Sequence, residues 1–257
     1  MSTRSIAFVV YGRGDPRGRP GDQAPMQATS AALIVAAGSS RRMQGHDKLW
    51  MPLAGRLTLA RTIDIFDASP LVDPIVLIVH AERITDAAAL CQQEGWRKIA
   101  GIVTGGPRRQ DSVRIGLDAL AKIAPGSQWV MIQDGARPLV TPAILEAGLI
   151  AAQEHQAAIA AVPIKDTIKH VEHGFVHSTI DRSLHWAVQT PQVFSFPLIH
   201  QAYSRLHTQV EVTDDAALLE QQGLQVAVFP GSYANIKITT QEDVLIAEAL
   251  IKGSGTL

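Results

Sequence analysis

Short apolar runs alternate with amphipathic segments along most of the chain after residue 30. The run Ala31–Ala37 is apolar throughout and ends at a small-residue turn, which predicts a strand buried on both faces. The segments Thr58–Ala68 and Ile84–Glu94 instead have apolar residues at helical spacing. Further strands are expected at Pro74–His80, Ile99–Val103, Trp129–Gln133 and Ala157–Pro163. This alternation predicts an α/β fold with a Rossmann-like, mostly parallel sheet and helices on both faces.

The segment between Pro163 and Pro191 breaks this alternation. Short runs with β-branched residues flank the pair His173-Gly174, a pattern that predicts a β-hairpin. We expect an arm over about residues 164–190 that projects from the sheet. An isolated two-stranded arm is marginally stable, so we expect it to pack on another subunit. After the arm, helices are expected at Pro197–Leu206, Thr213–Gln222 and Thr240–Ile251, and an extended segment at Leu224–Phe229.

Length and composition indicate one domain over residues 29–252. Residues 1–28 mix Gly, Pro, Arg and Asp around one brief apolar patch, so we expect a disordered N-terminal extension rather than a signal peptide. The net charge of −1 argues against a nucleic-acid partner, and no apolar run is long enough to cross a membrane. Cys91 is the single cysteine and is expected to be a buried thiol. These features predict a cytoplasmic protein.

Three cations, Arg41, Arg42 and Lys48, follow the turn after the first strand. Gly38 and the two serines after it form a turn whose backbone N–H groups can face a phosphate, and Arg42 and Lys48 can neutralise that phosphate. The stretch matches neither the Walker A loop nor the fingerprint G-x-G-x-x-G. Taken alone, it is equally compatible with a solvated loop.

Similar residues recur where later strands should end. GGPRRQDSV supplies Arg109 and Ser112 at a helix start, and QDGARP places Asp134 directly after an apolar strand. Asp134 can hold Mg²⁺ directly or through water, although an Asx-turn explains the local pattern equally well. In NIKIT, Lys237 must either reach solvent or meet an anion. The joint recurrence favours one anion site at the sheet edge.

Other polar groups have simpler explanations. Charged residues in the arm are typical of a solvated face. His170, His173 and His177 resemble a metal-ligand spacing, but side chains on a hairpin need not converge, and exposed arm residues are expected. The pair Asp214-Asp215 is expected at a helix N-terminus, with Thr213 or Asp214 as the cap, rather than at a metal.

The ordered set of motifs resembles one enzyme family. AAGSSRRM with Lys48, then GGPRRQDSV, DGARP, PIKDTIK, DRSLHWAVQTPQ, TDDA and NIKIT, is similar to 2-C-methyl-D-erythritol 4-phosphate cytidylyltransferases of the non-mevalonate isoprenoid pathway. The resemblance covers Ala31 to Ile251 and implies a nucleotide-diphospho-sugar transferase-like domain. It also implies transfer of CMP from CTP to 2-C-methyl-D-erythritol 4-phosphate, which yields 4-diphosphocytidyl-2-C-methyl-D-erythritol and pyrophosphate.

The resemblance also implies roles for individual residues. Arg42 and Lys48 would stabilise the transition state at the triphosphate, while Arg182 and Lys237 would position the methylerythritol phosphate. The nucleotide would be bound by Ala36, Ala37, Gly38, Gly106, Arg109, Ser112, Asp134, Gly135 and Ala136. The polyol phosphate would also contact Arg137, Thr167 and Thr190. Asp134 would hold Mg²⁺ or another divalent cation. The arm would cross to the second subunit of a homodimer, where Thr167, Arg182 and Thr190 would complete the neighbour's site.

Three alternatives remain at this stage. A ribitol 5-phosphate cytidylyltransferase shares much of the motif pattern and would differ in its polyol phosphate. A non-catalytic nucleotide-binding protein would bind CTP without releasing pyrophosphate. A dinucleotide-dependent oxidoreductase is disfavoured because the glycine fingerprint is missing.

Overall fold

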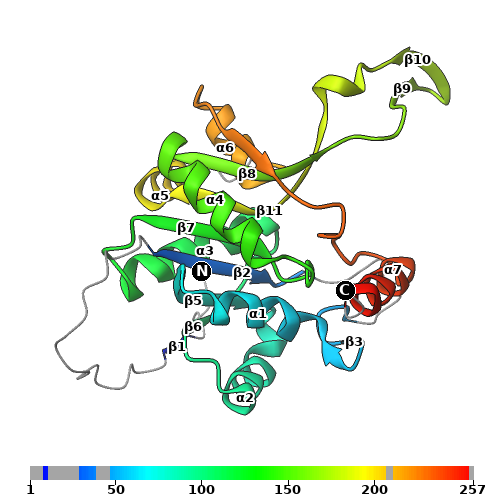
Figure 1. The fold of residues 1–257 in the computed structure, drawn as a ribbon. Helices are drawn as coiled ribbons and strands as arrows, with labels where there is room; N and C mark the ends of the chain where they lie inside the picture. The colour runs from blue at the N-terminus through cyan, green and yellow to red at the C-terminus, as the bar shows by residue number, and fades with distance from the viewer. Residues whose placement is uncertain (1–7, 11–28, 39–46, 207–210, 255–257) are drawn as a thin grey trace.

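A computed structural model describes residues 8–10, 29–38, 47–206 and 211–254 of the chain. Strands and helices alternate along most of it (Figure 1). The strands are β1 (Phe8–Val10), β2 (Ser30–Ala36), β3 (Pro52–Leu53), β4 (Arg56–Leu57), β5 (Val72–Val79), β6 (Ile99–Thr104), β7 (Trp129–Asp134), β8 (Ala157–Pro163), β9 (Lys169–Glu172), β10 (Phe175–Thr179), β11 (Trp186–Ser195) and β12 (Ala227–Pro230). The helices are α1 (Thr58–Ala68), α2 (Ile84–Glu94), α3 (Arg109–Ile123), α4 (Pro142–His155), α5 (Phe196–Ser204), α6 (Asp215–Glu220) and α7 (Gln241–Ser254), with 3₁₀ turns η2 (Ala81–Arg83) and η3 (Arg182–Leu184).

An eight-stranded sheet in the order β1-β6-β5-β2-β7-β11-β8-β12 forms the centre of the fold. The strands β6, β5, β2 and β7 pair in parallel, and β12 is parallel to β8. The strand β11 runs antiparallel between β7 and β8. The predicted Rossmann-like, mostly parallel sheet is therefore confirmed. Because β2, β5, β6 and β7 are parallel, their carboxyl ends lie along one edge of the sheet.

Helices cover both faces of the sheet, as predicted. On one face, Phe66 of α1 and Leu145 of α4 belong to one buried cluster. On the other face, Leu117 of α3 and Tyr203 of α5 belong to a second cluster. The strand β2 lies between them, and Leu33 has no exposed surface. Burial on both faces explains why this strand is a continuous apolar run.

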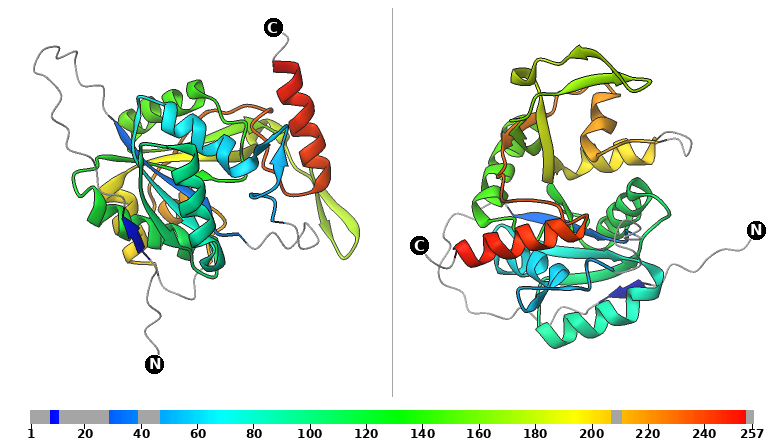
Figure 2. Two further views of the ribbon diagram at one scale, coloured as in Figure 1. Left: turned by 90° about the horizontal axis from the view of Figure 1, so that it is seen from below. Right: turned by 90° about the vertical axis from the view of Figure 1, so that its right-hand side faces the viewer.

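The closing helix α7 lies beside the β3–β4 hairpin, away from the two main layers (Figure 2). Ala247 of α7, Leu53 of β3 and Ile238 form a small core of their own. This packing fixes the segment that precedes α7, and that segment includes Lys237. The last helix therefore contributes to the edge of the sheet where the strands end.

Two strands differ from the sequence-based expectation. The arm was expected to extend to about residue 190, but Trp186 to Thr190 already belong to β11 of the central sheet. The buried polar residues Gln189, Thr190 and Gln192 interrupt the apolar pattern of β11. Their side chains form hydrogen bonds with residues that are distant in the sequence. Residues 8–10, expected within a disordered extension, form β1 and pair antiparallel with β6. The remainder of the expected extension, up to residue 28, lies outside the described residues.

The hairpin within the predicted arm is confirmed. The strands β9 and β10 form a separate two-stranded sheet that extends away from the body of the molecule (Figure 1). His173 and Gly174 join them with φ values of 50° and 85°. Two successive residues with positive φ are typical of the tight turns that suit the twist of a hairpin. All side chains of both strands are exposed, so the arm has no core of its own.

Two further expectations concern Cys91 and membrane spans. Cys91 is buried within α2, as expected, and burial raises the pKa of its thiol to about 12. A thiol with such a pKa stays protonated and unreactive near neutral pH. Within the described parts of the chain, no helix combines the length and apolar character needed to cross a membrane.

Candidate active site

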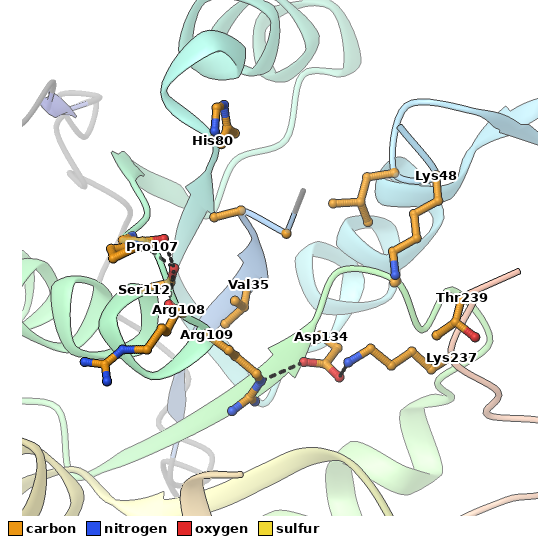
Figure 3. A pocket seen from close by; sticks show the side chains of 15 residues that line it. Val35, Lys48, His80, Pro107, Arg108, Arg109, Ser112, Asp134, Lys237 and Thr239 are labelled. Atoms are coloured by element: carbon orange, nitrogen blue, oxygen red, sulfur yellow. Dashed lines mark hydrogen bonds and ion pairs between the residues drawn. The ribbon is translucent and has the colours of Figure 1, made fainter. Parts of the chain in front are cut away.

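A cavity of about 660 Å³ lies at the edge where β2, β5, β6 and β7 end (Figure 3). Among the described residues, its lining includes four cationic side chains and one carboxylate, that of Asp134. Figure 3 shows the Lys48 side chain pointing into this space from the side opposite Arg109. A cavity with this excess of positive charge suits an anionic ligand.

Most predicted site residues that the structure describes meet at this cavity. Its lining includes Ala37, Gly38, Lys48, Gly106, Arg109, Ser112, Asp134, Ala136 and Lys237. Ala36 is the last residue of β2, and Gly135 follows β7 and donates its N–H to the Val35 carbonyl over 2.9 Å. A Cβ atom on Gly135 would lie 3.2 Å from that carbonyl oxygen, so the two strand ends approach closely. Arg42 lies outside the described residues.

Asp134 is the centre of a cluster of charges (Figure 3). Lys237 Nζ lies 2.7 Å from Asp134 Oδ2, and Arg109 Nε donates to Asp134 Oδ1 over 3.1 Å. Arg137 Nε lies 3.9 Å from Oδ2. Burial alone would raise the pKa of Asp134, but these positive charges outweigh it and hold the pKa well below its usual value. Asp134 therefore stays ionised near neutral pH.

Arg109 is held from behind by a buried acid that sequence analysis did not assign to the site. Its two terminal nitrogens donate to the two oxygens of Asp215 over 3.0 and 2.8 Å. Asp215 has no exposed surface, and Tyr203 donates its hydroxyl to Asp215 Oδ1 over 2.6 Å. Burial and the adjacent Asp215 raise the pKa of Tyr203 well above its usual value. The network fixes the guanidinium of Arg109 between Asp215 and Asp134.

The helix that carries Asp215 begins as expected. Asp214 is the N-cap of α6, and its Oδ1 accepts a hydrogen bond from the Ala217 N–H over 3.0 Å. Gln192 of β11 accepts from the N–H groups of Asp215 and Ala216, both over 3.1 Å. The motif TDDA was the sequence signal for this region. Its first aspartate, Asp214, caps the helix, and its second, Asp215, contacts Arg109.

The loop after β6 is built around two glycines. A Cβ atom on Gly105 would lie 2.3 Å from the Cβ of Ala37, and one on Gly106 would lie 2.5 Å from the Cβ of Asp111. Ser112 Oγ accepts a hydrogen bond from the Gly106 N–H over 3.0 Å. A larger residue at position 105 would therefore push the loop away from the end of β2, and one at position 106 would push it away from α3. Gly106 and Ser112 therefore shape the loop as well as line the cavity.

The segment with Lys237 is tied to the end of β7. The Ile238 N–H donates to the Ala136 carbonyl over 2.8 Å, which brings Lys237 next to Asp134. Asn235 is fully buried, and its amide donates to the Thr190 carbonyl over 2.9 Å. NIKIT therefore contributes a cation by docking on β7 and β11.

Two predicted substrate contacts lie behind Asp134 rather than in the cavity lining. Thr190 is buried, and its Oγ1 accepts a hydrogen bond from the Asp134 N–H over 3.0 Å. Arg137 donates to the Asn235 carbonyl over 2.7 Å. Within this chain, β11 thus buries Thr190 against Asp134, and the contribution of Thr190 to a neighbour's site stays a prediction.

The remaining predicted residues are on the arm. Thr167 and Arg182 are exposed, and Arg182 donates to the carbonyl of Lys165. Neither residue lines the cavity of its own chain, as far as the described residues show. The cavity instead includes His80, Arg108 and Thr239, which sequence analysis did not select. Arg108 and Thr239 lie within the motifs GGPRRQDSV and NIKIT, which were the available signals, whereas no motif marks His80 at the end of β5.

Comparison with known proteins matches most of this chain to one family. The family model IspD, 2-C-methyl-D-erythritol 4-phosphate cytidylyltransferase, matches residues 30–253. The chain belongs to this family. A protein of that name from Dehalococcoides mccartyi (strain CBDB1) is 48% identical over 222 residues, which are 86% of this chain and 95% of the relative. Another from Syntrophotalea carbinolica is 46% identical over 230 residues, 87% of this chain and 96% of the relative.

A solved structure supports the same membership of the cytidylyltransferase family. The 4-diphosphocytidyl-2C-methyl-D-erythritol synthase from Anaerococcus prevotii has a TM-score of 0.78 and 32% sequence identity. The comparison covers 87% of this chain and 96% of that chain. The family match includes the cavity edge, the arm and the segment with Lys237. It therefore supports the fold and the enzyme class that the sequence motifs predicted.

Proposed function

We propose that this chain transfers CMP from CTP to 2-C-methyl-D-erythritol 4-phosphate, releasing pyrophosphate. The observation that carries the proposal is the cation cluster around Asp134, at the sheet edge of a chain that belongs to the cytidylyltransferase family. The ends of parallel strands are where such sheets bind nucleotides. The family match favours methylerythritol phosphate over ribitol phosphate as the acceptor.

The reaction needs positive charge more than a general base. A phosphate oxygen of the polyol phosphate attacks the α-phosphorus of CTP, and the bond from that phosphorus to the departing pyrophosphate breaks. The attacking oxygen is already anionic, so the barrier comes from repulsion between two polyanions and from alignment. Lys48 and Lys237 both line the cavity and supply positive charge, and Arg42 would add to it. Preorganised charges of this kind stabilise a transition state effectively.

Asp134 and Arg109 would organise these charges. Asp134 holds Lys237 at 2.7 Å, while Asp215 holds Arg109 against Asp134. The cations are therefore placed before the ligands arrive, so little reorganisation is needed during the reaction. The small residues Ala37, Gly38 and Gly106 leave room for the nucleotide to approach the backbone.

The site also fits one divalent cation. Mg²⁺ prefers oxygen ligands and is bound in nucleotide sites by one or two carboxylates together with phosphate oxygens and water. Asp134 supplies one ionised carboxylate in the lining, and each of its oxygens has a second lone pair beyond its cationic partner. When bound, the ion would neutralise phosphate charge and orient the triphosphate. Asp134 is the residue that would hold it, directly or through water.

The arm would pack on a second copy of this chain. Large apolar side chains are exposed on the arm, with Phe175 at 80% and Leu184 at 77%, and at the adjoining start of β11, with Trp186 at 44%. A hairpin without its own core gains stability by burying such groups against a partner. In a homodimer arranged in this way, Thr167 and Arg182 would contribute to the neighbour's polyol phosphate site. Cross-linking and sedimentation of the purified chain would test the dimer.

Pyrophosphate release provides the test of function. We expect release from CTP with 2-C-methyl-D-erythritol 4-phosphate and Mg²⁺, and much weaker release with ribitol 5-phosphate or with no acceptor. The nucleotide product would be identified by mass spectrometry. A preference for ribitol 5-phosphate would show that this compound, and not 2-C-methyl-D-erythritol 4-phosphate, is the acceptor. Saturable CTP binding without pyrophosphate release under any of these conditions would overturn the catalytic proposal.

A further inference from the structure

The outer part of the arm brings three metal-ligating side chains together. Among the described residues, His170, Glu172 and His177 form a group whose ligand atoms all lie within 4.8 Å of one another. His170 Nε2 lies 3.6 Å from Glu172 Oε1, and His177 Nδ1 lies 3.9 Å from Glu172 Oε2. The two imidazole rings are 5.3 Å apart, edge to face. None of these three residues is in the lining of the cavity.

Hairpin geometry explains the convergence. His170 and Glu172 are two residues apart in β9 and therefore face the same side of the strand. In β10 the register shifts between Val176 and Ser178, and the extra residue is His177. Ser178 pairs with His170, so His177 lies beside that pair. A bulge of this kind redirects a side chain, and here it adds the second imidazole to the group.

We infer that His170, Glu172 and His177 form a binding site for a Zn²⁺-class divalent transition metal. Two imidazoles and one carboxylate are a known zinc ligand set that leaves a fourth position for water. With metal–ligand bonds of about 2.0–2.2 Å, tetrahedral ligands lie about 3.3 Å apart. The observed separations of 3.6 and 3.9 Å are slightly larger, and exposed side chains can close them by small rotations.

The ligand set also selects the type of metal. Imidazole nitrogen favours Zn²⁺, Cu²⁺ or Ni²⁺, whereas Mg²⁺ and Ca²⁺ prefer oxygen ligands throughout. With both histidines neutral, Glu172 gives the site one negative charge, which attracts a divalent cation. The site is thus distinct in chemistry from the proposed Mg²⁺ position at Asp134. Because its ligands come from both strands, the bound ion would link β9 to β10 in a hairpin that has no core.

The test uses the full-length, tag-free chain after treatment with a chelator. Zn²⁺ alone would be titrated by calorimetry, and the imidazole resonances of isotopically labelled protein would be followed by NMR. We expect saturable binding with shifts at His170 and His177. His170→Asn, His177→Asn and Glu172→Gln should each weaken binding at least about tenfold, since even changes in the partners of metal ligands have effects of that size.

His173→Asn is the matched control. His173 lies at the turn of the same hairpin with φ of 50°, a conformation that Asn tolerates, and it is not in the group of three. This variant should bind Zn²⁺ as tightly as the unaltered chain. Absence of saturable binding would overturn the inference. So would unchanged affinity in a combined His170→Asn and His177→Asn variant, because the ion would then be bound elsewhere.

Discussion

Arg109 at the cavity and Arg182 on the arm have the same side chain in opposite settings. Arg109 contacts two carboxylates, one of which is fully buried, whereas Arg182 is exposed and donates to a backbone carbonyl. Burial costs a charge its hydration, so Arg109 requires fixed counterions and adopts one geometry. An exposed arginine keeps its hydration and can reach a ligand or partner. The charged side chains of the cavity are therefore held in place within one chain. The position of Arg182 on the arm instead depends on the ligand or subunit that it contacts.

The largest expected effect is on stability, at the buried end of the cavity network. Asp215→Asn would remove the fully buried one of the two counterions of Arg109 and should lower the free energy of unfolding by about 3–5 kcal/mol. Urea denaturation would measure it. Glu220→Gln, which neutralises an exposed acid on the same helix α6, is the control and should change stability little. Equal losses in the two variants would show that the Arg109 pairing has no special energetic role.

A smaller free-energy effect is expected on turnover. Lys48→Ala removes a cation that lines the cavity and should lower kcat on the order of 100-fold or more, about 2.7 kcal/mol, with a modest loss of stability. Steady-state pyrophosphate release would measure this change. Lys122→Ala, an exposed position on α3, is the control and should retain normal kcat. Normal turnover in Lys48→Ala would contradict the assigned role of Lys48.

The smallest effect is expected at the arm. Arg182→Ala should raise the KM for the polyol phosphate about tenfold, or about 1.4 kcal/mol, because one charged hydrogen-bonding group is lost. Unfolding free energy should change by less than about 0.5 kcal/mol, as is usual for exposed positions. Arg97→Ala, an exposed loop arginine, should change neither quantity. A large loss of stability in Arg182→Ala would remove the contrast between the arm and the cavity.

Much of the fold was predictable because it depends on local pattern. The run Ala31–Ala37 indicated a buried strand, and His173-Gly174 indicated the hairpin turn. The strand β11 was harder to predict, because Gln189, Thr190 and Gln192 interrupt its apolar residues. These polar groups are compatible with a buried strand only because partners distant in sequence satisfy them. Gln192, for example, accepts hydrogen bonds from the start of α6.

The candidate site was predictable in part for a related reason. Strand ends in a parallel sheet share an edge, so Lys48, Arg109, Asp134 and Lys237 could be grouped from their motifs and order. Asp215 could not be connected to Arg109 in this way, since 106 positions separate the two residues. Local sequence explains the cap at Asp214 but carries no information on where the next carboxylate points.

The sequence by itself determined the alternation of strands and helices, the glycine turns and the supply of cations at the strand ends, because these follow from periodicity and backbone sterics. Tertiary structure alone decided which charges pair. It inserted β11 beside β7, turned Thr190 toward Asp134, and placed His177 beside His170 through a register shift. Such outcomes depend on contacts between distant segments, whose geometry exists only after the sheet has assembled.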